Sequence, residues 1–239
     1  MSLPILETVP WLVQTKLYPP QLRTDMVVRQ RLSDWLAQTA VSFPVTLISA
    51  PAGYGKTTLC ATLTRTLPQI PLAWLTLDEA DNDVNDFMAA LLGALQLLEP
   101  TFGTRAQWLL PTLSSLSDTE NGRSEIRRFM DVLLDDLVAG LPDKFVLVLD
   151  NLHVLKNGRL FLALDYLLDQ LPPQMHMVLA AQHDPPLVLP RLRAQQQLAE
   201  RNIVDMAFTR AETESLLNDR LTLGLAANEL DQVQNSSTD

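Results

Sequence analysis

The fold is decided by one stretch of the sequence: Val45-Thr46-Leu47-Ile48-Ser49-Ala50-Pro51-Ala52-Gly53-Tyr54-Gly55-Lys56-Thr57-Thr58. It begins as an apolar strand and runs into a loop that contains two glycines. Such a loop can bring several backbone N–H groups to one point, while the lysine supplies a mobile ammonium group and the following threonine a hydroxyl. Together these groups can hold the phosphates of a nucleotide and its Mg²⁺. The stretch therefore predicts a phosphate-binding loop.

One position departs from the usual pattern of this loop, G-x-x-x-x-G-K-[ST]. Ala50 stands where the first glycine is expected. An alanine is acceptable there if the turn does not need a positive φ angle at that residue. The alternative interpretation is a chance Gly-Lys-Thr-Thr in a strand-to-helix turn. Because a strand precedes the loop and a helical pattern follows it, we favour the phosphate loop.

The composition limits the class of protein. The chain has 239 residues, enough for one large domain or a domain and a half. Its single cysteine, Cys60, excludes an internal disulfide and a cysteine-rich zinc site. The three histidines lie far apart without the spacing of metal ligands, and no G-x-S-x-G motif occurs. Metal-ligand and serine-hydrolase interpretations are therefore not supported.

The charge and hydropathy of the chain also narrow its partners. With 18 basic and 28 acidic residues the formal net charge is -10, which would repel a phosphate backbone unless the basic groups were gathered on one face. We therefore expect no direct binding of nucleic acid by this segment. Charges or prolines interrupt every apolar run before 18 residues, and the N-terminus does not resemble a signal peptide. We expect a cytoplasmic protein that does not enter a membrane.

Apolar segments of strand length alternate with helical patterns, which indicates βαβ units and a parallel sheet covered on both faces. The sequence predicts five strands, at Val45 to Ser49, Leu72 to Leu77, Phe145 to Asp150, His176 to Ala181 and Ile203 to Phe208. We expect the α/β fold of a P-loop NTPase: a three-layer αβα sandwich whose five-stranded parallel sheet has the order 5-1-4-3-2, followed by the start of a small helical lid.

Several helices are expected around these strands. Apolar residues recur at helical spacing between Ile126 and Leu137 and between Leu160 and Leu171, and Val28, Leu32, Trp35 and Leu36 form a similar stripe before the loop. The stretch Pro100 to Gly122 predicts a long connection or short helices outside the sheet. We therefore divide the chain into an N-terminal arm and helix (1–40), a nucleotide-binding core (41–208) and the start of a lid (209–239), which looks truncated.

The lid is expected to begin with a capping box. Thr209-Arg210-Ala211-Glu212 has the required spacing ahead of Leu216, and a second short helical pattern runs from Ala226 to Val233.

A phosphate loop needs a carboxylate at the end of a neighbouring strand to orient Mg²⁺. Asp150 ends the continuous apolar strand Phe145 to Asp150, as a central parallel strand would. Asp78 also ends a strand, and with the next three residues it spells the D-E-A-D of helicases. We favour Asp150, because Asp78 belongs to the first strand after the loop and the other helicase motifs are absent. The stretch from Asp78 to Asp83 is interpreted as a helix cap.

Hydrolysis requires a group that positions or deprotonates the attacking water, and Asn151 occupies the position directly after the Mg²⁺ carboxylate. An amide can orient water but cannot accept its proton, and a general base is worth about 10²–10⁴ in rate. Asn151 as a helix-capping residue is an equal alternative.

These motifs together resemble the STAND signal-transduction ATPases, and within them the maltose-regulon activator and its relatives, the LuxR-type large ATP-dependent transcription regulators. The resemblance runs from about residue 14 to the end. Besides the phosphate loop, it rests on Lys16-Leu17 with Pro19-Pro20, Val28-Arg29-x-Arg31-Leu32, Trp74-Leu75-x-Leu77-Asp78 with Asp81-Asn82 and Phe87, Val148-Leu149-Asp150-Asn151-x-His153, Asp184-Pro185-Pro186 with Arg191-Leu192-Arg193, and Phe208-Thr209-x-x-Glu212.

The resemblance implies a nucleotide-binding switch domain. In such families ATP favours an open, self-associating state and ADP a closed one, and sensor and DNA-binding domains follow in the chain. It implies ATP or ADP with Mg²⁺ as the ligand. The base would lie near Val27, Val28 and Arg29, the phosphates on Ala52, Gly53, Tyr54, Gly55, Lys56, Thr57 and Thr58, and Mg²⁺ at Thr57 and, through water, Asp150.

Two residues depart from the family pattern. Asn151 replaces a second acidic residue, and Gln182 replaces an arginine that would report the γ-phosphate. We expect nucleotide binding with slow or absent hydrolysis, with Lys56, Asp150, Asn151 and Gln182 as the residues around the reaction. Arg191 or Arg193 could supply the missing charge, or serve in packing. A small-molecule kinase and a nucleotide-independent assembly scaffold are the alternative functions.

Overall fold

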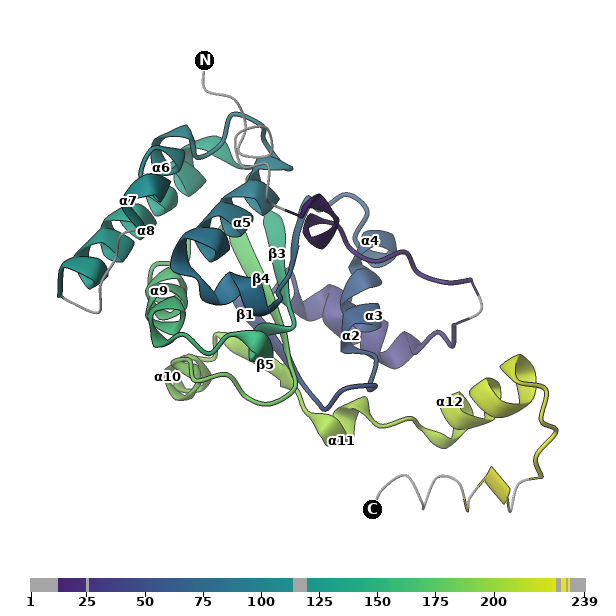
Figure 1. The fold of residues 1–239 in the computed structure, drawn as a ribbon. Helices are drawn as coiled ribbons and strands as arrows, with labels where there is room; N and C mark the ends of the chain where they lie inside the picture. The colour runs from purple at the N-terminus through teal and green to yellow at the C-terminus, as the bar shows by residue number, and fades with distance from the viewer. Residues whose placement is uncertain (1–12, 25, 114–119, 227–228, 231, 233–239) are drawn as a thin grey trace.

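The computed structural model describes residues 13–24, 26–113, 120–226, 229, 230 and 232. Its centre is a five-stranded sheet in which every pairing is parallel, in the order β2-β3-β4-β1-β5 (Figure 1). The strands are β1 (Val45–Ser49), β2 (Leu72–Thr76), β3 (Phe145–Asp150), β4 (Met175–Ala181) and β5 (Leu198–Arg201). Counted from the other edge, this is the predicted order 5-1-4-3-2.

The register of the sheet sets the position of the site. In β1, Ser49 pairs with Ala181 of β4, and Thr76 of β2 pairs with Asp150 of β3. The carboxyl ends of these strands therefore meet at one edge. Only β4 separates the strand that leads into the phosphate loop from the strand that ends in Asp150.

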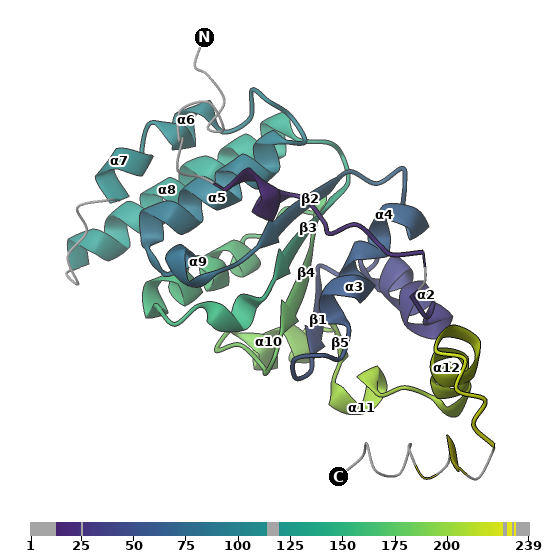
Figure 2. The ribbon, with the colours of Figure 1, turned by 45° about the vertical axis from the view of Figure 1, so that its right-hand side comes forward.

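Helices cover both faces of the sheet and form two separate cores (Figures 1 and 2). On one face, α2 (Gln30–Thr39), α3 (Lys56–Ala61) and α4 (Leu63–Thr66) pack over alternate strand residues such as Ile48 and Val178. On the other, α5 (Val84–Gln96), α8 (Glu120–Gly140), α9 (Gly158–Asp169) and α10 (Leu189–Ala194) pack over their neighbours, such as Leu47 and Leu179. The two-residue period of a strand explains this division.

The predicted helical stripes are confirmed in α8 and α9, and in α2 with one correction. Val28 does not belong to α2, which begins at Gln30, and its side chain is 56% exposed. Arg29 has non-helical backbone angles (φ -92°, ψ 73°) and occupies the N-cap position. The apolar spacing placed Val28 one turn before Leu32, but the helix has not yet begun at Val28.

Short helices fill most of the remaining connections. They are α6 (Thr104–Gln107), α7 (Leu110–Leu113), α11 (Ile203–Met206), α12 (Arg210–Glu214), the 3₁₀ turns η1 (Gln14–Leu17), η2 (Glu79–Asn82) and η3 (Leu152–Val154), and the π-helical turn η4 (Ser215–Arg220). The expected short helices between Pro100 and Gly122 are thus found as α6 and α7, while residues 114–119 lie outside the described residues.

The predicted fifth strand was misplaced. The edge strand is Leu198–Arg201, and most of the stretch expected to be extended, Ile203 to Phe208, forms helix α11. Asn202 caps that helix through its side chain, in a capping box with Asp205, and Val204 is 79% exposed. Strand β5 contains two charged residues among its four, so it lacks the apolar pattern by which a strand is recognised. The more apolar segment from Ile203 to Phe208 was therefore predicted as the strand instead.

The capping box expected at Thr209 and the helix cap expected between Asp78 and Asp83 are present. Thr209 accepts a hydrogen bond from the Glu212 amide at the start of α12, and Asp78 and Asp83 cap η2 and α5. The second lid helix expected from Ala226 to Val233 lies partly outside the described residues. In the part of the chain that is described, no helix is long and apolar enough to cross a membrane.

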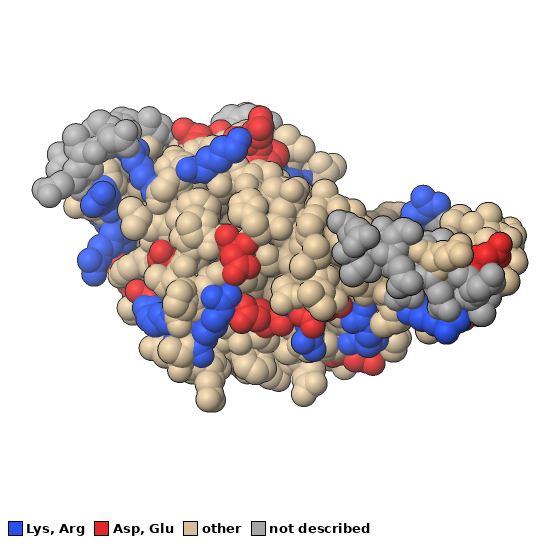
Figure 3. Space-filling model, turned by 90° about the horizontal axis from the view of Figure 1, so that it is seen from below, with Lys and Arg blue, Asp and Glu red and all other residues tan. Residues whose placement is uncertain are grey.

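Charged side chains are mixed on the face shown in Figure 3. Lysine, arginine and acidic residues alternate there among uncharged surface, without a continuous basic field in the part that is described.

An ion pair fixes the N-terminal segment to the turn η2, which follows β2. The Lys16 ammonium group lies 2.6 Å from a carboxylate oxygen of Asp81 and 3.2 Å from one of Asp78. Asp81 is buried, and burial raises the pKa of its carboxyl group. The hydrogen bond from Lys16 lowers that pKa and offsets part of the effect of burial. A buried carboxylate without its partner is costly.

We therefore expect Lys16→Met to lower the free energy of unfolding by about 3 kcal/mol, the cost of leaving a buried charge unpaired. Urea unfolding followed by circular dichroism measures this difference. Lys156→Met is the matched control, because Lys156 and its partner Glu79 are exposed and 4.0 Å apart; it should cost less than about 1 kcal/mol. Equal effects of the two substitutions would contradict the assignment.

Candidate functional site

The phosphate loop has the backbone conformation that its glycines allow. Gly53 and Gly55 have positive φ angles of 85° and 78°, and Gly55 is the N-cap of α3. Ala50 is not among the described residues with positive φ, so the turn does not require a glycine there. The departure from the glycine pattern is therefore compatible with the loop.

The side chain of Lys56 lies against its own loop. Its ammonium group donates hydrogen bonds to the carbonyl oxygens of Ala50, at 2.6 Å, and Pro51, at 2.8 Å. The side chain is 7% exposed, and burial lowers its pKa, partly offset by the negative charge of Asp150. The loop carbonyls hold a charge that the surrounding apolar core cannot solvate.

The structure brings together Thr57 and Asp150, the two residues expected to hold Mg²⁺. The Thr57 hydroxyl lies 2.8 Å and 3.1 Å from the two carboxylate oxygens of Asp150, which is 1% exposed. Burial raises the pKa of Asp150. Hydrogen bonds from the Thr57 hydroxyl and the backbone N–H of Asn151, together with the charge of Lys56, lower the pKa and so oppose this effect. Hydroxyl and carboxylate oxygens suit Mg²⁺, whose remaining ligands are commonly phosphates and waters.

The described residues contain no group of three or more histidine, cysteine or acidic side chains that could hold a metal ion. A magnesium ion at Thr57 and Asp150 would therefore depend on nucleotide phosphates for part of its coordination. The competing carboxylate, Asp78, is engaged elsewhere: it accepts a hydrogen bond from the Ala80 amide and pairs with Lys16.

Asn151 and Gln182 follow the ends of two adjacent strands, β3 and β4. Asn151 has left-handed backbone angles (φ 61°, ψ 33°), which asparagine tolerates better than most residues. It occupies the N-cap position of η3, but its side chain makes no capping hydrogen bond, so the side chain has no role in the cap.

Gln182 contacts His153, a residue of the resemblance motif to which the sequence assigned no role. Its side-chain nitrogen lies 2.6 Å from Nε2 of His153. Burial, the charge of Lys56 and His183 all lower the pKa of His153, and its Nδ1 is buried without a hydrogen-bond partner in the described structure. His153 belongs to the motif Val148-Leu149-Asp150-Asn151-x-His153, and its position three residues after Asp150 is the sequence signal that points to the site.

A cavity of about 260 Å³ lies beside the phosphate loop. Six of the residues expected to contact nucleotide line this cavity: Val27, Arg29, Gly53, Tyr54, Gly55 and Thr58. It is also lined by residues that were not predicted: Met26, Ser33, Leu59, Thr62, Phe208 and Leu216. Val28, Ala52, Lys56 and Thr57, which were also expected to contact nucleotide, do not line it. Phe208 and Leu216 come from the segment after β5, so the start of the expected lid forms part of the cavity wall.

Arg29 connects three parts of this cavity. Its guanidinium group donates to the carbonyl oxygen of Tyr54 at 3.3 Å and to that of Met206 at 2.7 Å, and it lies 4.5 Å from the ring centre of Phe208. Its Nε is 3.3 Å from Glu212. One side chain thus contacts the phosphate loop, the connection after β5 and helix α12.

Arg31 completes the cluster around Glu212. Its Nε lies 3.1 Å from the Glu212 carboxylate, and it also donates to the carbonyls of Asp205 and Ala207. Burial alone would raise the pKa of Glu212, but the hydrogen bonds from the Thr209 amide and Arg31 and the charge of Arg29 bring it below its ordinary value. The ionised form is therefore the one that the fold stabilises.

The parallel sheet order, the glycine loop between β1 and α3, and the Thr57–Asp150 contact define a P-loop NTPase. A family model described as AAA ATPase domain matches residues 28–180. The chain belongs to this family of AAA ATPase domains.

Among similar proteins, the HTH-type transcriptional regulator MalT of Serratia proteamaculans is 30% identical over 210 residues, 88% of this chain and 22% of that protein. MalT of Yersinia enterocolitica is 28% identical over 214 residues, 90% of this chain and 22% of that protein. These likenesses confirm the resemblance inferred from the motifs. The chain spans about a fifth of the length of these curated relatives.

The fold is similar to the crystal structure of Cdc6p from Pyrobaculum aerophilum, with a TM-score of 0.50 and 18% identity. The match covers 90% of this chain and 54% of that one. At this identity the likeness concerns the fold alone.

The Glu212 cluster predicts a dependence of stability on pH. A carboxyl group whose pKa is lower in the folded state adds stability that is fully present above its unfolded pKa, about 4.3, and is lost as pH falls through the folded pKa. We expect Glu212→Gln to lower the free energy of unfolding by about 1–3 kcal/mol at pH 7, because charge-assisted hydrogen bonds are lost. The difference in the free energy of unfolding between the variant and the unsubstituted chain should shrink as pH falls below about 4.3.

Urea unfolding at a series of pH values measures both effects. Glu214→Gln is the matched control, because Glu214 is exposed on the same short helix. A cost for Glu212→Gln that stayed constant down to pH 3 would show that the cluster does not stabilise the carboxylate.

Proposed function

We propose that this chain is an ATP- and ADP-binding switch domain of a transcription regulator similar to MalT, with slow or impaired hydrolysis. The observation that carries the proposal is the meeting of Lys56, Thr57 and Asp150 at one edge of the sheet, beside a cavity whose wall includes the segment after β5. The loop amides and Lys56 would bind the phosphates, Thr57 and Asp150 would hold Mg²⁺, and the base would enter the cavity near Val27 and Arg29.

The switch part of the proposal rests on Arg29. Because Arg29 contacts the Tyr54 carbonyl and Glu212 together, a nucleotide that changes the loop also changes the contacts of α12. Only a ligand with different affinities for two arrangements can shift their populations. We infer that ATP and ADP differ in this way, that the segment from Thr209 begins a lid, and that self-association and further domains use the resulting difference.

The slow-hydrolysis part rests on Asn151 and Gln182. Asn151 cannot accept a proton, and the amide of Gln182 carries no charge and lies against His153. The two arginines considered as substitutes are already paired: Arg191 forms an ion pair with Asp169, and Arg193 pairs with Asp184 and Glu200. These pairs also weaken the kinase interpretation, which needs free arginines in a lid.

Titration calorimetry with ATP and ADP in the presence of Mg²⁺ tests nucleotide binding. We expect both to bind, and Lys56→Ala to weaken ATP binding about 10- to 100-fold through loss of charge-assisted hydrogen bonds to the phosphates. Lys144→Ala is the control, because the Lys144 ammonium group contacts only the carbonyl of Val41 among the interactions described. Absence of binding to the unsubstituted, folded chain would overturn the proposal and favour the scaffold.

We expect Asn151→Asp to increase the rate of ATP hydrolysis, up to about 10²-fold, because it supplies a carboxylate that can accept the proton of the attacking water. Aspartate also tolerates the left-handed backbone of this position. Phosphate release under saturating ATP measures the rate, and Asn157→Asp, at the N-cap of α9, is the control. An unchanged rate for Asn151→Asp would remove the general-base explanation for slow hydrolysis.

A further inference from the structure

The cavity beside the phosphate loop extends away from the loop along α3. Thr58 and Thr62 both line it, and the rise of a helix places Thr62 about 6 Å further from the loop than Thr58. Ser33, in the first turn of α2, lines the cavity as well. In the function proposed above the loop binds the phosphates, so the part of the cavity lined by Ser33 and Thr62 would receive the base.

The two hydroxyl groups at this end of the cavity belong to buried residues. Thr62 is 7% exposed and Ser33 is 4% exposed. Their surroundings are apolar, because Leu32 and Leu36 of α2 share one core cluster with Leu59 of α3. In such surroundings a hydrogen bond is stronger than in water, and a polar group that finds no partner is costly.

The Thr62 hydroxyl can only accept a hydrogen bond from a ligand. It donates its proton to the carbonyl oxygen of Leu59 at 2.6 Å, which leaves only the lone pairs of its oxygen for another group. The backbone N–H of Thr62 donates to the same carbonyl at 3.0 Å, so this carbonyl stays bonded when the hydroxyl is removed. A ligand group that contacts the Thr62 oxygen must therefore be a donor.

The Ser33 hydroxyl can act in either sense. The backbone N–H of Ser33 bonds to the carbonyl of Arg29 within α2, but its hydroxyl has no hydrogen bond within the described part of the chain. A serine hydroxyl has one proton to donate and lone pairs to accept with. It can therefore donate to an acceptor on the ligand, beside the donor that Thr62 requires.

We propose that Thr62 and Ser33 select adenine over guanine, an inference that rests on the nucleotide binding proposed above. Adenine carries an exocyclic amine, which is a donor, next to the ring nitrogen N1, which is an acceptor. The amine would donate to the Thr62 oxygen, and the Ser33 hydroxyl would donate to N1. Guanine has an oxygen in place of the amine, so two acceptors would face each other at Thr62.

Titration calorimetry of the full chain with three nucleotides and Mg²⁺ tests this assignment. The nucleotides are ATP, GTP and purine riboside triphosphate, which has N1 but lacks the exocyclic amine. We expect ATP to bind about 3- to 10-fold more tightly than purine riboside triphosphate, the effect of one neutral hydrogen bond. GTP should bind more weakly than either, because it adds an unpaired acceptor.

Substitutions separate the two hydroxyl groups. Thr62→Val keeps the shape of the side chain; it should abolish the advantage of ATP over purine riboside triphosphate without changing the affinity for the latter. Thr62→Ser keeps the hydroxyl and should keep the advantage. Ser33→Ala should weaken both nucleotides about 3- to 10-fold, because both carry N1. Thr64→Val is the matched control: the Thr64 hydroxyl donates to the carbonyl of Ala61 in the same way, but Thr64 does not line the cavity.

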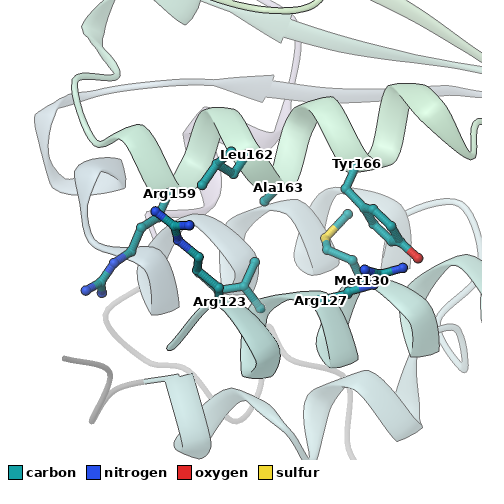
Figure 4. Close-up of a pocket in the computed structure, with 8 residues that line it drawn as sticks. Arg123, Arg127, Met130, Arg159, Leu162, Ala163 and Tyr166 are labelled. Atoms are coloured by element: carbon teal, nitrogen blue, oxygen red, sulfur yellow. The ribbon is translucent and has the colours of Figure 1, made fainter. Parts of the chain in front are cut away.

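A second cavity provides a control for the place of binding (Figure 4). It has a volume of about 260 Å³, lies between α8 and α9, and shares no lining residue with the cavity beside the loop. Arg123 and Arg127 lie at its opposite ends, and arginine attracts a triphosphate whatever its base. Arg123→Gln should therefore leave the affinities for all three nucleotides unchanged.

The inference is overturned if the folded chain binds ATP and GTP equally, or if Thr62→Val weakens ATP and purine riboside triphosphate alike. In both cases nucleotide binding itself persists, so the function proposed above stands. The inference is also overturned if Thr64→Val or Arg123→Gln reproduces the effect of Thr62→Val. Absence of binding by all three nucleotides would overturn the proposed function, and this inference with it.

Discussion

The contact between the Thr57 hydroxyl and the Asp150 carboxylate is the interaction on which the arrangement of the site depends. It joins the first turn of α3 to the end of β3, although β4 lies between β1 and β3 in the sheet. A carboxylate that is 1% exposed must be hydrogen-bonded. Here the donors are the Thr57 hydroxyl and the backbone N–H of Asn151. The parallel order of the sheet is what brings these groups together, because it places the ends of β1, β4 and β3 at one edge. A ligand at this edge contacts groups that are already held in place.

Lys56 and Arg29 give the phosphate loop two different constraints. Lys56 binds the loop carbonyls of Ala50 and Pro51 from within, and the same ammonium group can exchange these carbonyls for phosphate oxygens at little cost in desolvation, because it is already buried. Arg29 binds the Tyr54 carbonyl from outside and is itself held by Glu212 and the Met206 carbonyl. Arg29 thus links the phosphate loop to residues that lie more than 150 positions later in the sequence.

Much of this architecture could be predicted from the sequence, because strong local signals coincide with it. The glycines and lysine of the loop, the apolar strands β1 to β4 and the capping box at Thr209 each follow from short-range chemistry. The failures have physical causes as well. Edge strand β5 is polar and paired on one side only, and Val28 matches a helical stripe although the helix starts later. The pairing of Arg29 and Arg31 with Glu212, and of Gln182 with His153, joins residues whose proximity only the tertiary fold determines.

The connection between β3 and α9 is held by hydrogen bonds to η2 and to α9. Asn82, from η2, accepts hydrogen bonds from the amides of Lys156 and Asn157, at 2.5 Å and 3.2 Å, and donates one to the carbonyl of Val154. Asn157 in turn caps α9 by accepting a hydrogen bond from the Arg159 amide. This short segment, which begins directly after Asp150 and Asn151, is therefore fixed to η2 at one side and to α9 at the other. These four hydrogen bonds in so short a connection leave the end of β3, which carries Asp150, joined directly to η2 and to the first turn of α9.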